Sequence, residues 1–286
     1  MRILVTGAGG MLARSLVPVF ESRGNAVTAL TRAELDVTRC EDVRRAVRDT
    51  APDWVVHLAA FTDVDGCERE PDRAFVVNGL GARNAAMAAF EVGAGVLALS
   101  SDYVFDGRVR EPRREHDMIG PLSQYGRSKL AGERGAREVN PRHIIARTSW
   151  LYGAGGRNFV DTILARAKSG EPLSVVDDQR GSPTWTGDLS VALADLMDRG
   201  EYGTYHVTNS GDCTWHEFAE AICREAGVSA EIRRITSEEL ARPARRPAYS
   251  VLSSIWFEHV SGRRMPHWQD ALARYLRQSN TTRGGT

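Results

Sequence analysis

Short hydrophobic segments rich in Val, Ile and Leu alternate along this chain with longer segments of helical periodicity. This alternation predicts a parallel sheet covered by helices, because parallel strands need connections long enough to hold a helix. The fold class is therefore expected to be α/β, a Rossmann-type doubly wound parallel sheet up to about residue 176. We expect its strands at residues 3–6, 26–30, 54–58, 96–99, 143–147 and 173–176, and helices at 11–23, 41–49, 71–92, 125–139 and 158–169.

The alternation is less regular in the C-terminal third, which suggests a smaller α/β lobe packed on the first part. We expect residues 1–150 to form a dinucleotide-binding domain, to which residues 158–185 partly return, and residues 151–286 to form an interleaved substrate-binding lobe. Within that lobe we expect helices at 186–197, 214–226 and 266–277, an extended segment at 203–207, a rigid loop at 242–247 and a frayed tail from Ser279 to Thr286.

The charges balance, with 37 Lys+Arg against 37 Asp+Glu and a pI near 7.1, so nothing indicates a nucleic-acid or anionic-membrane partner. The chain enters its first strand directly, no stretch approaches a membrane span, and the four cysteines match no zinc motif. We therefore expect a cytoplasmic protein with no membrane association. Only Lys129 and Lys168 among the cations are lysines, so each is examined for a role that arginine could not fill.

The first strand runs into a glycine turn, Gly7-x-x-Gly10, that opens a helix at Met11 and Leu12. Glycines there let the backbone approach a pyrophosphate, whose charge meets the helix N-terminus. The sequence therefore predicts a dinucleotide.

An NAD-type fingerprint has an acid after the second strand, where this chain has Arg32. An arginine there can pair with a 2′-phosphate, so we favour NADPH, although Glu34 or Asp36 could still serve NADH. Asp36 and Val37 could instead border the adenine.

Tyr125 and Lys129 lie four residues apart on a predicted helix and so share a face. An ammonium beside the phenol is expected to lower a pKa that starts near ~10, which would make Tyr125 a proton donor and acceptor near neutral pH. Ser101 follows the fourth strand, at the sheet edge where ligands bind, and could hydrogen-bond a carbonyl about to be reduced.

Gly7-x-x-Gly10, Ser101 and Tyr125-x-x-x-Lys129 together resemble an extended short-chain dehydrogenase/reductase. Longer blocks are similar to the dTDP-4-dehydrorhamnose reductase family: residues 59–65, 100–107, 125–133, 147–153 and 178–184, with Arg246-Pro247 near the end.

The resemblance implies hydride transfer from the nicotinamide to C4 of a dTDP-4-keto-6-deoxyhexose, with Tyr125 protonating the developing alkoxide. Ser101 would orient the carbonyl, and Lys129 would tune Tyr125 and hold the nicotinamide ribose. It places further cofactor contacts at Met11, Leu12, Leu58, Ala59, Ala60, Thr62 and Ser100, and sugar-nucleotide contacts at Asp102, Val104, Phe105, Trp150, Asn158 and Arg246, the last at the pyrophosphate.

Two positions depart from the family pattern. Ser101 stands where the family usually has Thr, which keeps the hydroxyl. Ser15 stands where some members have a Glu that helps to bind a divalent ion between subunits. We therefore expect no metal requirement and either a monomer or a homodimer.

Other functions remain open at this stage. A sugar-nucleotide epimerase or another extended short-chain dehydrogenase would share the cofactor turn and the Tyr/Lys pair. A dehydratase would have Thr-Asp-Glu at 101–103, where this chain has Ser101-Asp102-Tyr103 and so lacks the base for elimination. A non-catalytic subunit, similar to the regulatory β subunit of methionine adenosyltransferase, would not need an intact Ser101, Tyr125 and Lys129. The sugar and the C4 stereochemistry stay undetermined.

Overall fold

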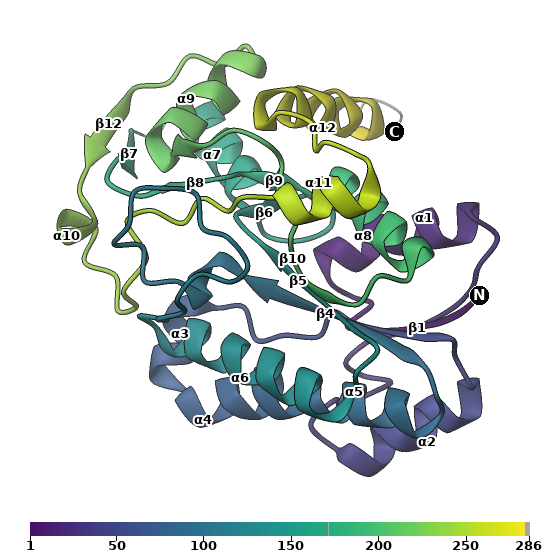
Figure 1. Cartoon of the computed structure of the whole chain (residues 1–286). Helices are drawn as coiled ribbons and strands as arrows, with labels where there is room; N and C mark the ends of the chain where they lie inside the picture. Colours follow the sequence, from purple (N-terminus) through teal and green to yellow (C-terminus); the bar gives the residue numbers. More distant parts are fainter. Residues whose placement is uncertain (171, 284–286) are drawn as a thin grey trace.

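The computed structural model describes residues 1–170 and 172–283, with side chains described for residues 1–170 and 172–279. At its centre is a six-stranded sheet in the order β10-β5-β4-β3-β1-β2, in which every neighbouring pair is parallel (Figure 1). The predicted α/β class is confirmed. The strands are β1 (Arg2–Thr6), β2 (Ala26–Leu30), β3 (Trp54–His57), β4 (Gly95–Ser101), β5 (His143–Thr148) and β10 (Gly203–His206).

The strand order reverses beside β1, since β2 lies on one side of it and β3 and all later strands lie on the other. At such a reversal the connections leave toward opposite faces and open a crevice beyond the carboxyl ends of the strands. The turn after β1 and the loop after β3 therefore meet where a ligand of this fold binds.

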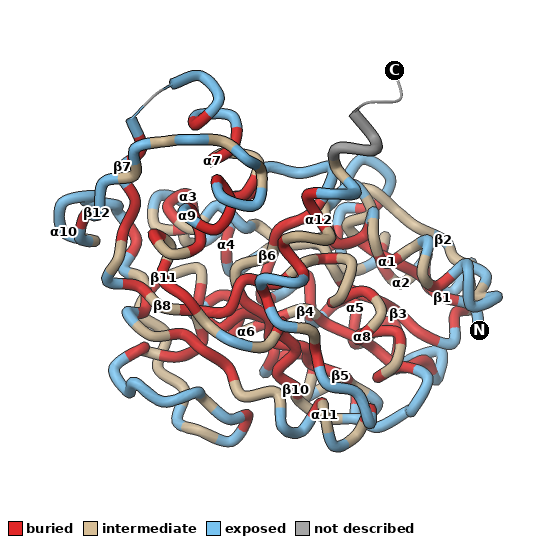
Figure 2. The backbone as a smooth tube through the Cα atoms, turned by 90° about the horizontal axis from the view of Figure 1, so that it is seen from above, coloured by how far each residue is buried: buried red, intermediate tan, exposed pale blue. Residues whose placement is uncertain are grey.

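Alternate residues of β1 supply the cores on the two faces of the sheet. Ile3 and Val5 belong to a cluster with residues of α1 and α8, whereas Leu4 packs with residues of α2 and α5. A strand buried on both faces is apolar throughout, which is why the predicted strands show no polar alternation. Figure 1 shows α1 (Met11–Ser22), α8 (Thr186–Arg199) and α11 (Ile255–Ser261) on one face, and α2 (Cys40–Thr50), α5 (Gly81–Glu91) and α6 (Gln124–Val139) on the other, while Figure 2 shows the buried centre between them.

A second hydrophobic cluster lies outside the main sheet, among α7 (Phe159–Lys168), α9 (Trp215–Glu225) and α12 (Trp268–Arg283). It also contains Leu173 and Val175 of β7 (Leu173–Val176), which pairs in parallel with β12 (Ile232–Ile235). We expected residues 173–176 in the main sheet, and this prediction was wrong. The sixth strand is instead β10, the extended segment expected at 203–207, because a short apolar run does not specify its pairing partner.

Two predicted helices differ from the structure. The helix expected at 71–92 is divided into α4 (Pro71–Ala74), the π-helical segment η1 (Phe75–Leu80) and α5. The last helix continues to Arg283, so the tail predicted to begin at Ser279 is helical as far as Arg283, and residues 284–286 lie outside the described residues. The remaining elements are α3 (Val64–Arg69), η2 (Asp102–Val104), β6 (Leu151–Tyr152), β8 (Arg180–Gly181), β9 (Thr184–Trp185), β11 (Cys213–Thr214) and α10 (Ser237–Leu240).

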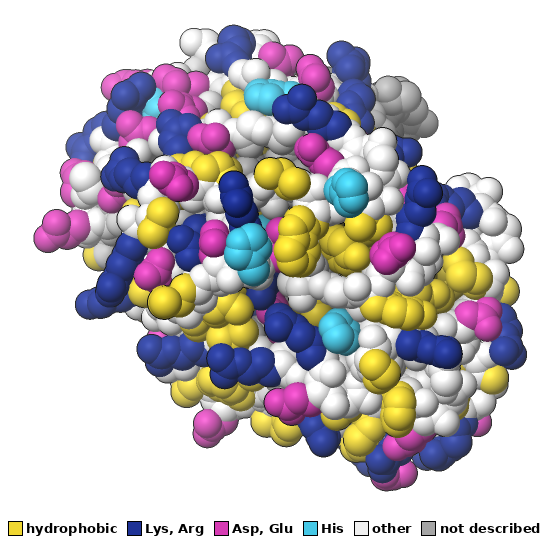
Figure 3. All heavy atoms as spheres, viewed as in Figure 1, with side chains coloured by type: hydrophobic (Ala, Val, Ile, Leu, Met, Phe, Trp, Pro, Cys, Tyr) yellow, Lys and Arg dark blue, Asp and Glu magenta, His cyan; other side chains and the backbone are white. Residues whose placement is uncertain are grey.

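The surface carries both signs of charge in close mixture. Figure 3 shows basic and acidic side chains interspersed over the face seen in Figure 1, as the balanced composition leads one to expect. None of the helices in the described part of the chain is both long and apolar enough to cross a bilayer.

Candidate active site

The glycine turn after β1 has the geometry that a bound pyrophosphate requires. Gly7 has a positive φ of 73°, and a Cβ at this position would lie 2.6 Å from the Ala59 nitrogen, so only glycine fits. The Gly10 N–H donates to the Gly7 carbonyl at 3.0 Å, which directs the chain into α1 at Met11. Among the described residues no side chain caps this N-terminus, and the first turn of α1 holds no acid. Backbone N–H groups are thus left for an anion.

The segment after β2 leaves one cation free and both nearby acids occupied. Within the described residues, Arg32 is exposed and its guanidinium has no hydrogen bond or ion pair. Glu34 accepts from the Thr31 N–H at 2.8 Å and its hydroxyl at 2.7 Å, and Asp36 accepts likewise from Thr38 at 3.0 and 2.7 Å. These bonds lower the pKa of both carboxyls. The free group in this segment is therefore suited to an anion.

Asn78 fixes the loop after β3 by hydrogen bonds to its backbone, and the sequence analysis did not select this residue. Asn78 is buried, accepts from the Phe61 N–H at 2.8 Å, donates to the Phe61 carbonyl at 3.0 Å and donates to Ser128 on α6 at 2.9 Å. A polar residue inside the apolar run Phe75–Leu80 was the signal for it. The cofactor residues predicted in this loop are half-buried or exposed at the crevice: Leu58, Ala59, Ala60 and Thr62. Two cofactor residues predicted elsewhere, Leu12 and Val37, are instead buried in the core.

The three predicted catalytic residues lie on two adjoining elements. Ser101 ends β4, and its Oγ accepts from the Tyr103 N–H at 3.2 Å, while Tyr125 and Lys129 lie in the first turns of α6. Gly126 allows α6 to approach, since a Cβ there would collide with the Tyr103 carbonyl. The Ser101 hydroxyl acts on the pKa of Tyr125, so the two hydroxyls lie close together at the carboxyl end of β4.

We expected Lys129 to lower the pKa of Tyr125, and this prediction was wrong. Burial raises the pKa of Tyr125 above its usual value, and the Ser101 hydroxyl only partly opposes this rise. Lys129 is not among the groups that influence this pKa. Burial also lowers the pKa of Lys129 to about 8, against a smaller opposite effect of Glu133. Loss of solvation therefore dominates both groups, and Tyr125 is held in its protonated form.

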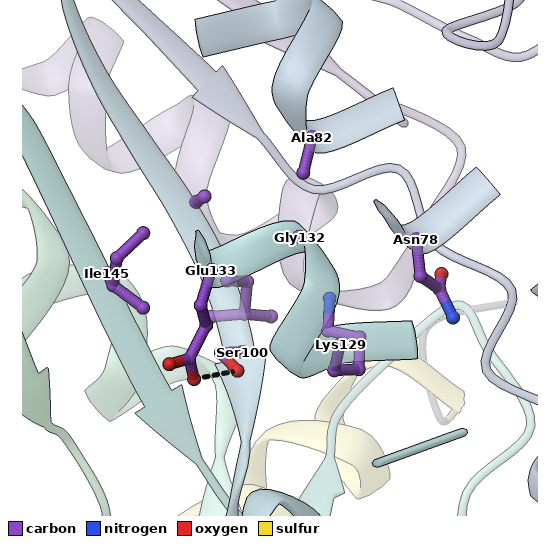
Figure 4. A pocket seen from close by; sticks show the side chains of 9 residues that line it. Asn78, Ala82, Ser100, Lys129, Gly132, Glu133 and Ile145 are labelled. Atoms are coloured by element: carbon purple, nitrogen blue, oxygen red, sulfur yellow. Dashed lines mark hydrogen bonds between the residues drawn. The ribbon is translucent and has the colours of Figure 1, made fainter. Parts of the chain in front are cut away.

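Lys129 lines a small cavity between α6 and β4 of about 10 Å³, near the lower limit for one water molecule. Figure 4 shows Lys129, Gly132 and Glu133 on α6 beside Ser100 of β4, with Asn78 on the far side of Lys129. No residue in the described ranges forms a hydrogen bond or ion pair with the Lys129 ammonium. The ammonium is thus available to an added oxygen ligand.

A buried carboxylate, Glu133, ties α6 to the sheet and was also missed. It accepts from Ser100 at 2.6 Å and from two nitrogens of Arg147 at 2.8 Å each, and it pairs with Arg137 as well. Ser100 was expected to contact the cofactor, but its hydroxyl donates to Glu133.

The predicted sugar contacts fall into two groups. Asp102 is buried next to Ser101, and Trp150 is half-buried and stacks on Trp215 with ring centroids 3.5 Å apart and planes at 4°. The side chains of Val104 and Phe105 are fully buried in a core cluster, so only their backbone could meet a ligand. Asn158 caps α7 and donates to the Gly153 carbonyl at 2.9 Å, so its side chain is used within the protein.

Arg246 is anchored by Asp65, which the sequence analysis did not select. Both Asp65 oxygens lie 3.2 Å from Nη2 of Arg246, and Asp65 also pairs with Arg242 and accepts from the Ala244 N–H. This contact fastens the loop at 242–247 to α3. Beside it lies a cavity of about 270 Å³, lined by Leu122, Gln179, Ser237, Glu238, Leu240, Arg242, Ala244, Arg245 and Arg246.

Comparisons with known proteins agree with this geometry over the whole chain. The family model described as RmlD substrate binding domain matches residues 1–281. A dTDP-4-dehydrorhamnose reductase of Streptomyces griseus is 47% identical over 278 residues, covering 95% of this chain and 91% of that protein. A spore coat polysaccharide biosynthesis protein of Bacillus subtilis is 44% identical over 280 residues and 98% of each chain.

A solved structure extends the likeness to three dimensions. The dTDP-4-dehydrorhamnose reductase of Bacillus anthracis, in complex with NADP, superimposes with a TM-score of 0.94 at 38% identity, covering 97% of this chain and 99% of that one. The chain described here therefore belongs to the RmlD substrate binding domain family and is an oxidoreductase of the dTDP-4-dehydrorhamnose reductase type.

Proposed function

We propose that the protein reduces the C4 keto group of a dTDP-4-keto-6-deoxyhexose with NADPH. The observation that carries this proposal is the meeting of the Ser101 and Tyr125 hydroxyls at the carboxyl end of β4, beside the glycine turn. Two hydroxyls at one point can both hydrogen-bond a carbonyl oxygen as it gains charge. Activity with a panel of substrates decides whether the sugar is dTDP-4-dehydrorhamnose or a related deoxysugar.

The residues of the crevice fit a dinucleotide. Gly7 and Gly10 would admit its pyrophosphate, the N-terminus of α1 at Met11 would meet the negative charge, and Lys129 would bind the nicotinamide ribose. Arg32, which has no partner in the described part of the chain, favours NADPH over NADH, because the acids that could hold a ribose hydroxyl are already occupied. When bound, the reduced nicotinamide supplies the hydride.

Tyr125 acts as the proton donor and Ser101 orients the carbonyl. Burial keeps the phenol protonated, as a reduction requires, since the oxygen of the product takes a proton. Lys129, one turn further along α6, acts on the cofactor and not on the phenol: its ammonium, whose pKa burial lowers to about 8, would hold the nicotinamide ribose beside Tyr125.

The nucleotide end of the substrate is assigned to the loop that carries Arg246. One cavity is lined by Arg242, Arg245 and Arg246. A guanidinium group can donate two parallel hydrogen bonds to two oxygens of one phosphate. We place the sugar between this cavity and Ser101, against Asp102, the backbone at 104–105 and the face of Trp150, with Asn158 holding the neighbouring turn. On this proposal residues 151–286 supply the substrate-binding lobe and residues 1–150 the cofactor domain.

The test is oxidation of NADPH by the full-length protein with a panel of dTDP-4-keto-6-deoxysugars. Wild type should consume NADPH in proportion to substrate, and Tyr125→Phe should lower kcat about 100-fold or more while the cofactor still binds. Tyr202→Phe, an exposed tyrosine remote from the crevice, is the matched control and should retain full activity. No turnover of any sugar by folded, cofactor-binding wild type would refute the proposal.

A further inference from the structure

The hydroxyl of Ser101 has a single proton, and the structure directs it at a carboxylate. This proton goes to Oδ1 of Asp102 at 2.8 Å, and the oxygen accepts from the Tyr103 N–H at 3.2 Å. The Tyr125 hydroxyl lies nearby, at the same end of β4. In this arrangement the proton of Ser101 points away from a substrate oxygen.

Asp102 is the group that fixes this direction. Its residue is 2% exposed, and no described residue meets its Oδ2 in hydrogen-bond geometry. A buried carboxylate oxygen without a donor is costly, and protonation removes that cost. Burial accordingly raises the pKa of Asp102 to about 6, although the Ser250 and Ser101 hydroxyls act in the opposite direction.

The other titratable groups around Asp102 come from three elements and one loop. Tyr103 follows it on η2, and Tyr125 faces it from α6; burial raises the pKa of both phenols, and Asp102 raises it further. Cys67 of α3 lies beyond Tyr125, and Arg246 reaches Tyr103 from the loop at 242–247. The phenols and the thiol stay neutral near pH 6, because their pKa values lie far above it. Asp102 is then the group of this cluster that changes charge there.

We infer that Asp102 is a positioning residue whose ionisation decides whether the Ser101 proton faces Asp102 or the substrate. This inference rests on the proposed function. When Asp102 is ionised, Ser101 donates its proton to Asp102. When Asp102 takes a proton from solvent, it no longer accepts from Ser101 and itself donates to the Ser101 oxygen. Ser101 is then released to donate to the carbonyl oxygen beside Tyr125, and no bond to carbon is involved.

The single proton of Ser101 makes the two states exclusive. The Tyr103 N–H keeps one lone pair of Ser101 in both, and the Ser101 proton faces either Asp102 or the substrate. Losing a donor aimed at a developing oxyanion lowers kcat about 100-fold or more. A loss of that order is therefore expected as Asp102 ionises.

The kinetic test is the pH profile of kcat/KM for the full-length enzyme with NADPH and an accepted sugar nucleotide. In wild type, kcat/KM should fall about 100-fold between two plateaus as pH rises through the pKa of Asp102. Asp102→Asn and Ser101→Ala should each lack this transition, whereas Ser101→Thr, which keeps the hydroxyl, should show it. The kcat of the Ser101→Ala/Asp102→Asn double variant should be no lower than that of Ser101→Ala, because Asp102 acts on the chemical step through Ser101, whereas the loss of its contact with the sugar is expected in KM. A transition that persists in either single variant, or losses of kcat that multiply in the double variant, would overturn the inference.

A second measurement does not depend on turnover and so separates this inference from the proposed function. Carbon NMR of the aspartate-labelled protein follows each carboxyl as it titrates, and the Asp102 signal is the one missing from Asp102→Asn. It should titrate near pH 6 in wild type and at higher pH in Ser101→Ala, because the Ser101 hydrogen bond lowers the pKa of Asp102. Titration in the ordinary aspartate range, or no shift in Ser101→Ala, would overturn the inference even if the reductase activity is found.

Discussion

Replacing Glu133 with Gln removes a charge from the interior while preserving the shape of the side chain. Glu133 accepts hydrogen bonds from Ser100 and from two nitrogens of Arg147, and the side chains of Glu133 and Arg147 are each 1% exposed. A glutamine would offer one carbonyl oxygen and turn an N–H toward donors of Arg147. The guanidinium would then keep its charge in the core without the carboxylate to which it is hydrogen-bonded.

The expected loss in the free energy of unfolding is about 3–5 kcal/mol, the cost of removing one partner of a buried ion pair. This is a large part of the ~5–15 kcal/mol that typically separates folded from unfolded chains. Because Glu133 follows Lys129 by one turn of α6, kcat should fall as well, through displacement of the helix that carries Tyr125 and Lys129.

Urea unfolding followed by circular dichroism measures the effect, with two comparisons. Glu41→Gln breaks the ion pair between Arg44 and Glu41, in which the Glu41 side chain is 73% exposed. This substitution should lower the free energy of unfolding by less than about 1 kcal/mol. Glu133→Gln/Arg147→Met removes both charges and should recover most of the stability lost in Glu133→Gln. A loss below about 1 kcal/mol in Glu133→Gln, or a double variant no more stable than it, would refute this account of the cluster.

The difference in stability between wild type and Glu133→Gln should depend on pH, in the direction set by the pKa shift of Glu133. Burial raises the pKa of Glu133, but the hydrogen bond and charge of Arg147 outweigh it, so the folded-state pKa lies below the usual 4.5. A depressed carboxyl pKa contributes stability that is present above the unfolded value and is lost as pH falls through the folded value. The gap between wild type and Glu133→Gln should therefore be constant near neutral pH and close below about pH 4.

Three further predictions concern the ligands. Arg32→Gln should raise the KM for NADPH about 10-fold or more and leave that for NADH unchanged, because Arg32 has no partner within the described residues; equal effects on both cofactors would contradict the 2′-phosphate assignment. Asp65→Asn should raise the KM for the sugar nucleotide severalfold with the KM for NADPH unaltered, since Asp65 holds Arg246 in place; an unchanged substrate KM would argue against the loop as the diphosphate site. Activity should be complete in EDTA, as Ser15 bonds Thr186 at 2.8 Å where some relatives are expected to have a metal-binding Glu, and a loss restored by magnesium would refute this.

The parallel sheet could be predicted from the sequence because its inner strands, such as β1, β3 and β4, are buried on both faces and so form apolar runs. The same property hides which run pairs with which, and for this reason Leu173–Val176 was placed in the main sheet and the residues of β10 were not. Pairing is decided by contacts across long stretches of chain, which a local pattern does not contain.

The candidate site shows a similar division. Ser101, Tyr125 and Lys129 could be identified because their spacing relative to a strand end and a helix is local information. The sign of the Tyr125 pKa shift could not, because it depends on how completely surrounding elements exclude water. Asp65, Asn78 and Glu133 were missed because each acts through partners distant in sequence, such as Arg246 for Asp65.

The position of β10 has a consequence for how the chain can be divided. This strand covers one side of β5, although 54 residues separate Thr148 from Gly203. A fragment ending near residue 150 or 200 would leave β5 as an open edge, with a row of unpaired backbone groups able to recruit a strand from another molecule. Expression of the N-terminal half alone should therefore give aggregates, and during synthesis the sheet remains incomplete until about residue 206 has emerged.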